Sequence, residues 1–189
     1  KGAPTYRATL NLNGGGSLAR YYVSVSYVDE GGMYKVDEGL KDYNTNANYR
    51  RWNYRLNVDM DITKSTLLKV GVAGSLDKKN EPGMAGNIWA SAMRNNPISV
   101  PVMYSNGYVP AYGSENDQLN PWVAATQTGY QETWNNKLQA NATLEQSLNF
   151  ITKGLKFIGR YGFDTNNYQW INRKKFPEMW RAEQNRASD

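Results

Sequence analysis

The chain has 189 residues, a length that suits one domain, and it contains neither cysteine nor histidine. Those two absences exclude disulfide scaffolds, thiolate zinc sites, cysteine nucleophiles, Ser-His-Asp triads and histidine-ligated metals. The net charge of +5 invites a nucleic-acid hypothesis, but the basic residues are scattered and only Arg173 to Lys175 forms a run. We therefore expect no nucleic-acid partner.

Six segments alternate between apolar and polar residues, which is the pattern of β-strands whose two faces meet different surroundings. Between Asn53 and Thr63, for example, Tyr54, Leu56 and Val58 alternate with Asn, Arg and Asp residues. The expected strands lie near residues 5–13, 21–28, 51–62, 66–77, 132–150 and 155–165. Their short connections predict antiparallel pairing of sequence neighbours, so the expected fold class is all-β.

The connections alternate between short and long. Because antiparallel strands put every second connection on the same side, the short ones are predicted to lie at one end of the sheet and the long ones at the other. This segregation is typical of outer-membrane β-barrels, which have short periplasmic turns and long extracellular loops. The longest connection, residues 78–131, also carries the spacing of a short helix from Gly86 to Asn95, ended before Pro97.

The alternating faces suit lipid on one side and a hydrated interior on the other. The polar faces are rich in Asn, Gln, Thr and Ser, and no run of about 18 apolar residues predicts a transmembrane helix. Aromatic residues expected near the ends of the apolar faces resemble interfacial girdles: Trp52, Tyr54, Trp134, Phe150, Phe157 and Phe163. We expect about six strands of a large transmembrane outer-membrane β-barrel. A soluble β-sandwich that binds glycans and a passive porin-like pore remain open as alternatives.

Few residues point to catalysis or metal binding. Gly14 to Ser17 lacks the Gly-Lys-Ser/Thr of a phosphate loop. Asp59 and Asp61 share a polar strand face, which is more typical of two solvated residues than of a metal site. No spacing singles out a pair for glycoside hydrolysis among the loop acids Glu115, Asp117, Glu178 and Glu183. We predict no catalytic residue, no metal and no cofactor, and we do not expect an enzyme.

The aromatic residues of the long connection are the predicted binding residues, because flat aromatic faces stack on sugar rings and other flat apolar ligand faces. The candidates for substrate or partner contact are Trp89, Tyr104, Tyr108, Tyr112 and Trp122. The alternative interpretation is that these side chains pack the long connection onto itself.

Four stretches, taken in order, resemble one family. They are YYVSVSYVDEGGMYK (residues 21–35), YRRWNYRLNVDMDITKSTLLKVGVAGS (49–75), NNPISVPVMYSNGY (95–108) and LEQSLNFITKGLKFIGRYGFD (144–164). The set resembles the SusC/RagA group of TonB-linked outer-membrane transporters of Bacteroidetes. The resemblance covers nearly the whole chain.

This resemblance implies a closed barrel of about 22 strands with an N-terminal plug. It implies import of oligosaccharides or peptides across the outer membrane of a Gram-negative cell, with a SusD-like surface lipoprotein as a lid. The TonB complex would supply the energy through parts absent from this chain. The chain would then be one stretch of the barrel domain, without the plug domain. The resemblance carries over no catalytic residue.

Overall fold

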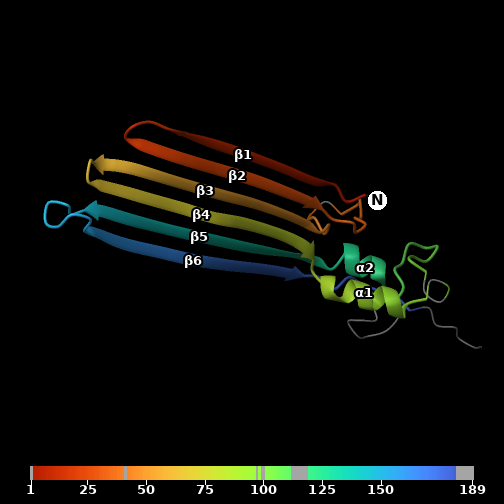
Figure 1. The fold of residues 1–189 in the computed structure, drawn as a ribbon. Helices are drawn as coiled ribbons and strands as arrows, with labels where there is room; N and C mark the ends of the chain where they lie inside the picture. Colours follow the sequence, from red (N-terminus) through yellow and green to blue (C-terminus); the bar gives the residue numbers. More distant parts are fainter. Residues whose placement is uncertain (1, 41, 97, 99–100, 112–118, 182–189) are drawn as a thin grey trace, which may run out of the picture.

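Six long antiparallel strands form one sheet in which each strand pairs with its neighbours in the sequence (Figure 1). The computed structural model describes residues 2–40, 42–96, 98, 101–111 and 119–181. The strands are β1 (Thr5–Gly15), β2 (Ala19–Gly31), β3 (Asn48–Thr63), β4 (Thr66–Pro82), β5 (Gly129–Ser147) and β6 (Lys156–Lys174). Two short helices, α1 (Ala85–Arg94) and α2 (Pro121–Thr126), lie between β4 and β5. The expected all-β, antiparallel class is confirmed.

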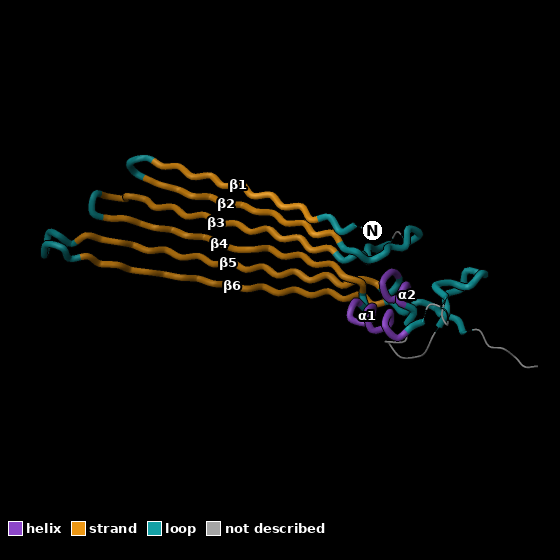
Figure 2. Tube along the Cα trace, turned by 45° about the vertical axis from the view of Figure 1, so that its right-hand side comes forward, coloured by secondary structure: helices purple, strands orange, loops and turns teal. Residues whose placement is uncertain are grey.

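The connections segregate by length, as the sequence predicts. Residues 16–18, 64–65 and 148–155 turn the chain at one end of the sheet. The described residues of 32–47 and 83–128, including both helices, lie at the opposite end (Figures 1 and 2). No helix in the described part of the chain is long and apolar enough to cross a membrane.

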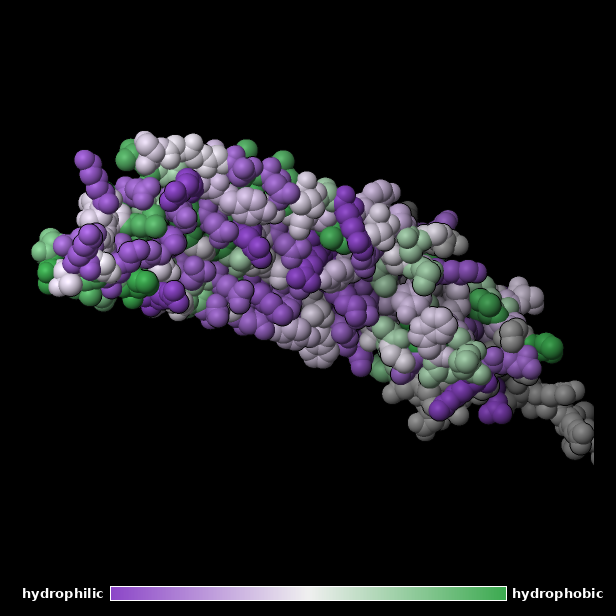
Figure 3. All heavy atoms as spheres, viewed as in Figure 1, coloured by the Kyte–Doolittle hydropathy of each residue, from purple (hydrophilic) through white to green (hydrophobic). Residues whose placement is uncertain are grey.

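The strand registers give the sheet an apolar face and a polar face. One row of paired residues across all six strands lies on the apolar face: Leu12, Val23, Leu56, Val72, Ala140 and Phe163. The next row points the opposite way and defines the polar face: Asn11, Ser24, Arg55, Ala73, Gln139 and Asp164. Successive side chains of a strand point to opposite sides of the sheet. This register therefore places the alternating apolar residues of the strands on one face and the alternating polar residues on the other. Hydrophilic residues cover most of the strands on the face shown in Figure 3.

Several element bounds differ from those expected. β3 begins at Asn48, β4 continues to Pro82 and β6 continues to Lys174, so the strands extend further toward the long connections than the alternation indicates. At the other end β5 stops at Ser147, and Phe150 is a turn residue that is 80% exposed. The expectation of a strand to residue 150 is therefore wrong.

The turn between β5 and β6 is stabilised by its own local hydrogen bonds. The Gly154 N–H donates to the Asn149 side chain over 2.8 Å, and Gly154 has a φ of 86°. Such a left-handed residue favours glycine and stops continued strand pairing.

Tyr54 also departs from the expected girdle position, because it pairs with Gly74 near the middle of the apolar face, where a Cβ on Gly74 would collide with its hydroxyl.

The main buried hydrophobic cluster lies beside the sheet end rather than under the sheet. The helical cap, which we define as Met84, α1, α2 and the described residues between the two helices, contains the buried side chains Met84, Ile88, Leu119, Ala124 and Ala125. Tyr34, Ala85 and Met179 pack against this cluster. By contrast, large apolar side chains of the sheet stay exposed, including Leu10 at 71% and Tyr161 at 70%.

Local signals explain both helices. α1 occupies the segment predicted from the apolar spacing, and the Asn95 amide at its end donates to the Ser91 carbonyl over 2.8 Å. The sequence analysis missed α2, which Asn120 caps by accepting a hydrogen bond from the Trp122 N–H over 3.0 Å, with Pro121 at the first helical position. Asn at the cap followed by Pro is a recognised helix start.

Candidate functional site

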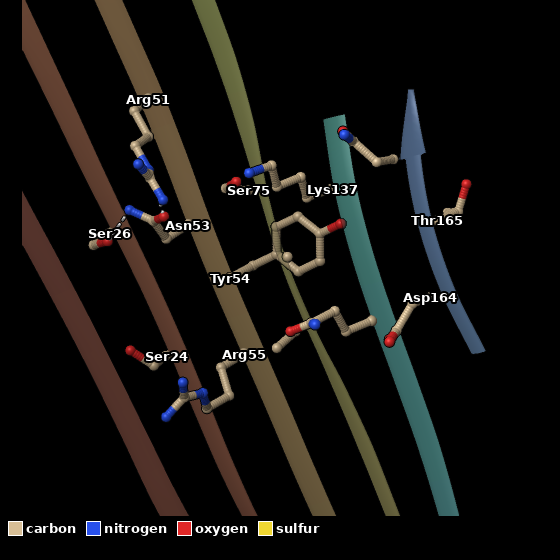
Figure 4. A pocket seen from close by; sticks show the side chains of 14 residues that line it. Ser24, Ser26, Arg51, Asn53, Tyr54, Arg55, Ser75, Lys137, Asp164 and Thr165 are labelled. Carbon is tan, nitrogen blue, oxygen red and sulfur yellow. Dashed lines mark hydrogen bonds between the residues drawn. The ribbon is translucent and has the colours of Figure 1, made fainter. Parts of the chain in front are cut away.

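A cavity of about 580 Å³ lies in the polar face near the centre of the sheet (Figure 4). Strands β2 to β6 all contribute residues to it. Its lining consists of the polar-face residues Ser24, Ser26, Arg51, Asn53, Arg55, Ala73, Ser75, Lys137, Gln139, Asp164 and Asn166. Three residues whose register positions belong to the apolar face, Tyr54, Gly74 and Thr165, complete the lining. Most of these side chains are hydrogen-bonding groups, so the cavity suits a polar solute.

The cavity is hollow because β4 carries small side chains between strands that carry long ones. Ala73 lies between Arg55 of β3 and Gln139 of β5 in one row of the sheet. In the next row Ser75 lies between Asn53 and Lys137. Short side chains flanked by long ones leave a depression over β4.

The depression ends where a neighbouring side chain leans over β4. Gly71 is the next polar-face residue of β4 after Ala73, and a Cβ there would lie 2.8 Å from the Asn141 amide nitrogen. The Asn141 side chain thus covers Gly71, and neither residue lines the cavity. This explains why the hollow occupies only part of the strand.

A chain of polar contacts fixes one wall of the cavity. The Arg51 Nε–H donates to the Asn53 side-chain oxygen over 2.8 Å and lies 3.4 Å from an Asp77 carboxylate oxygen. The Asn53 amide in turn donates to the Ser26 hydroxyl over 3.1 Å. Figure 4 draws the two hydrogen bonds among Arg51, Asn53 and Ser26, which hold the Asn53 amide in one orientation.

The opposite wall carries a lysine that crosses β4. Figure 4 shows the Lys137 side chain extending from β5 toward Ser75. Ser75 is only 5% exposed, whereas Lys137 and Arg55 are exposed to the cavity. An ammonium, a guanidinium and a hydroxyl are therefore available as donors to a solute. In the described part of the chain, no group of three or more acidic, His or Cys side chains is placed to hold a metal ion.

The predicted aromatic residues do not form one site with this cavity. Trp89 is 66% exposed on α1, and Trp122 lies on α2. Tyr104 accepts a backbone hydrogen bond from Gly107 in a turn, over 2.9 Å. Tyr112 lies outside the described residues. None of the four described aromatics lines the cavity.

Tyr108 contacts a residue from beyond β6. Its ring stacks on the Trp180 ring with a centroid separation of 4.8 Å and an interplanar angle of 21°. The backbone holds this arrangement, because the Trp180 N–H donates to the Val109 carbonyl over 2.8 Å and its carbonyl accepts from Ala111 over 2.7 Å. For Tyr108 this geometry fits the alternative in which loop aromatics pack the long connection onto other parts of the chain.

Comparison of the chain with protein-family models and with curated proteins finds no match. The resemblance to SusC/RagA transporters therefore remains a hypothesis based on the motifs, and function has to be argued from the geometry.

Sequence reasoning missed Arg55, Ser75 and Lys137 as candidate site residues. Each occupies an ordinary polar position within an alternating strand, so no single strand distinguishes it. The available signal was the sequence Gly71-Val72-Ala73-Gly74-Ser75, whose polar-face positions are all small. Only the strand register reveals which long side chains stand beside them.

Proposed function

We propose that the sheet is part of the wall of a transmembrane β-barrel in a Gram-negative outer membrane. In this proposal the protein imports oligosaccharides or peptides in the manner of the SusC/RagA transporters. The observation that carries the proposal is a sheet whose two faces differ in polarity and are both open. Among the described residues, the strands form one sheet and no second sheet packs on it.

The apolar face has the exposure expected of a surface that meets lipid. Leu12 is 56% exposed, Phe163 is 49% exposed and Leu56 is 39% exposed, although all belong to one apolar row. Soluble monomers rarely expose apolar patches larger than a few hundred Å². Lipid would cover this face without a second protein layer.

The apolar face also has an aromatic and charged border toward the long connections. Trp52 packs on Tyr27 with ring centroids 4.3 Å apart, and the Lys78 ammonium lies 4.4 Å from the Trp134 ring. In the row of Lys78 and Trp134, which is the next one outward from Trp52, Arg50 pairs with Asp29 over 3.3 Å. Aromatic residues followed by charged pairs suit the boundary between acyl chains and headgroups.

The height of the apolar band fits an outer membrane. The apolar positions from Trp52 to Met60 extend about 27 Å along β3, from the rise per residue of a strand. A strand tilt of about 40° reduces this to about 21 Å, close to the roughly 25 Å apolar band of outer-membrane barrels.

The two outer strands support membership of a larger barrel. Within the described residues, β1 pairs only with β2, and β6 pairs only with β5. Unpaired strand edges promote association, and small barrels begin at about eight strands. We therefore assign further strands of the same barrel to these edges.

The remaining parts of the proposal follow from this orientation. The polar face would line a hydrated lumen, and the end with residues 32–47, residues 83–128 and the helical cap would be extracellular. There it would contact substrate and a SusD-like lipoprotein lid, while the TonB complex would act through other parts of the protein. No catalytic role is assigned.

The test is a comparison of adjacent thiols, made possible because the chain contains no cysteine. Gln139→Cys and Ala140→Cys are introduced separately into the intact protein in isolated outer membranes. A water-soluble maleimide is expected to label Cys at 139, while Cys at 140 reacts only with a lipid-soluble maleimide. Lys153→Cys, in the exposed turn between β5 and β6, is the accessible control.

Equal labelling of positions 139 and 140 by the water-soluble reagent would refute the proposal. A stable, monodisperse protein purified from the cells without detergent would refute it as well, and would favour the soluble β-sandwich alternative.

A further inference from the structure

We infer that the cavity in the polar face is an anion-selective site, which takes solutes that carry carboxylate, sulfate or phosphate groups. This inference rests on the proposed function, because it requires the polar face to be hydrated. It goes beyond that function by giving the chemical class of solute that the lumen wall favours.

The first argument is the distribution of ion pairs along the polar face. Toward the short turns, Lys69 pairs with Glu145 over 2.6 Å. Toward the long connections, Lys79 pairs with Glu81 over 2.7 Å. In the part of the chain that the structure describes, Lys137 of the central rows forms no ion pair. The two β4 lysines on either side of the central rows are thus paired with carboxylates, whereas Lys137 is not.

Arg55 is the second central cation without a carboxylate partner among the described residues. Its neighbours in the same row on β2 and β4, Ser24 and Ala73, are neutral, and the acidic Asp164 of that row lies three strands away on β6. Its guanidinium provides a planar set of N–H donors that matches two oxygens of a carboxylate, sulfate or phosphate. Because the adjoining strands present neutral residues in this row, that donor set is available to a solute.

The charge balance of the lining favours anions. The lining contains three basic side chains and one acidic side chain. Arg51 is already opposed by Asp77, which leaves Arg55 and Lys137 against Asp164. Figure 4 shows Asp164 on β6, away from the Lys137 ammonium near β4. Clefts lined by one sign of charge raise the local concentration of the opposite ion about 10-fold or more.

Ser75 provides an independent observation. Only 5% of it is exposed, and it lines the cavity. The Lys137 side chain extends toward it (Figure 4). A hydroxyl and an ammonium side by side at the floor of a cavity would both donate to an oxyanion, and hydrogen bonds to charged groups are about twice as strong as neutral ones.

The test measures how fast charged reagents reach a thiol at the cavity floor. Ala73→Cys is introduced into the intact protein in its membrane, and its reaction with a sulfonate-bearing and a quaternary-ammonium methanethiosulfonate is followed at low salt. Thr9→Cys, on the same face but outside the cavity, gives the reference ratio of the two rates. We expect the anionic reagent to be favoured at position 73 by about 10-fold over that reference.

Two further measurements connect the rate ratio to the proposed residues. Lys137→Gln in the Ala73→Cys background is expected to abolish most of the preference, whereas Lys153→Gln, the same change in the turn, leaves it intact. Citrate and inorganic sulfate are each expected to slow the reaction in a saturable way, and sucrose is not. Protection by citrate alone assigns the site to carboxylates, and protection by sulfate alone assigns it to sulfate-type anions.

The outcomes separate this inference from the function on which it rests. If both reagents modify position 73 at the reference ratio, or if neither anion protects it, the polar face is hydrated but the anion site is refuted. If neither reagent reaches the thiol in the membrane although both modify it after denaturation, the hydrated lumen itself is refuted. If the Ala73→Cys protein fails to assemble, the same measurement is made with Gln139→Cys, on the β5 side of the cavity.

Discussion

The sheet and the helical cap place their apolar residues in opposite environments. In the cap, Val123 and Ala124 are completely buried, and Ile88 is 7% exposed. In the sheet, the apolar residues Leu10 and Tyr161 on the outer strands are 71% and 70% exposed, and Leu56 on the central strand β3 is 39% exposed. The apolar side chains of the cap are therefore buried by neighbouring residues of this chain, whereas the apolar face of the sheet needs lipid or another protein surface to cover it. This contrast is the physical basis of the membrane proposal.

The largest expected effect separates buried from exposed positions within one helix. Ile88→Ala in α1 removes a buried side chain from the cap cluster and is expected to cost about 2–5 kcal/mol of local stability. Met93→Ala, at an 85% exposed position of the same helix, is expected to cost less than about 0.5 kcal/mol. Hydrogen exchange of the cap amides measures both. Equal loss of protection would contradict the assignment of the cluster as the core of the cap.

The next effect tests the sheet side of the comparison. Ala142→Arg puts a charge on the apolar face between Val70 and Tyr161, and is expected to cost about 2–4 kcal/mol near the bilayer midplane. Thr143→Arg adds the same side chain to the polar face and is expected to cost less than about 1 kcal/mol. Refolding of the intact protein into lipid vesicles under a urea titration measures both costs. Similar values at the two positions would show that the faces do not meet different media.

A smaller effect distinguishes packing from binding among the aromatics. Tyr108→Ala removes the stacked contact with Trp180 and is expected to cost about 1 kcal/mol of stability and some surface protein. Trp89→Ala, at a 66% exposed position, is expected to leave stability unchanged. If Trp89 contacts substrate or the lipoprotein lid, its loss weakens binding by about 10-fold, typical of an interface aromatic.

Growth on the nutrient that requires this protein, measured with surface protein quantified in parallel, separates the two roles. Poor growth of the Trp89→Ala strain together with depleted surface protein would remove the binding role and leave only packing.

The smallest predicted effect concerns the helix that the sequence analysis missed. Asn120 accepts from the Trp122 N–H and donates to the Val102 carbonyl over 3.1 Å, so it joins α2 to a distant part of the long connection. Asn120→Ala is expected to cost about 1 kcal/mol, while Asn120→Asp, which keeps the capping acceptor, costs less. A urea titration followed by cap fluorescence from Trp122 measures the difference. If both variants lose stability equally, the cap contributes nothing and the bond to Val102 accounts for the loss.

The sequence by itself determined the strands, their antiparallel order and the separation of short from long connections. These features depend on local alternation and on loop length, which can be read without knowing what lies beside each strand. The helix at 85–94 was predictable for the same reason, because its apolar spacing is contained within one short segment. Phe150 marks the limit, since its strand-like spacing continues into a turn that Asn149 and Gly154 close.

Only the tertiary structure decided which polar residues share a cavity and which aromatics pack. Arg55 and Lys137 are distant in sequence, and they line the same cavity because β4 lies between them with Ala73 and Ser75 on that face. A one-residue change of register would move the small residues to the opposite face, although the composition of every strand would stay the same. Tyr108 similarly gains its stacking partner, Trp180, only when the chain returns to the long connection after β6. Such contacts depend on pairing between distant segments, which no local pattern encodes.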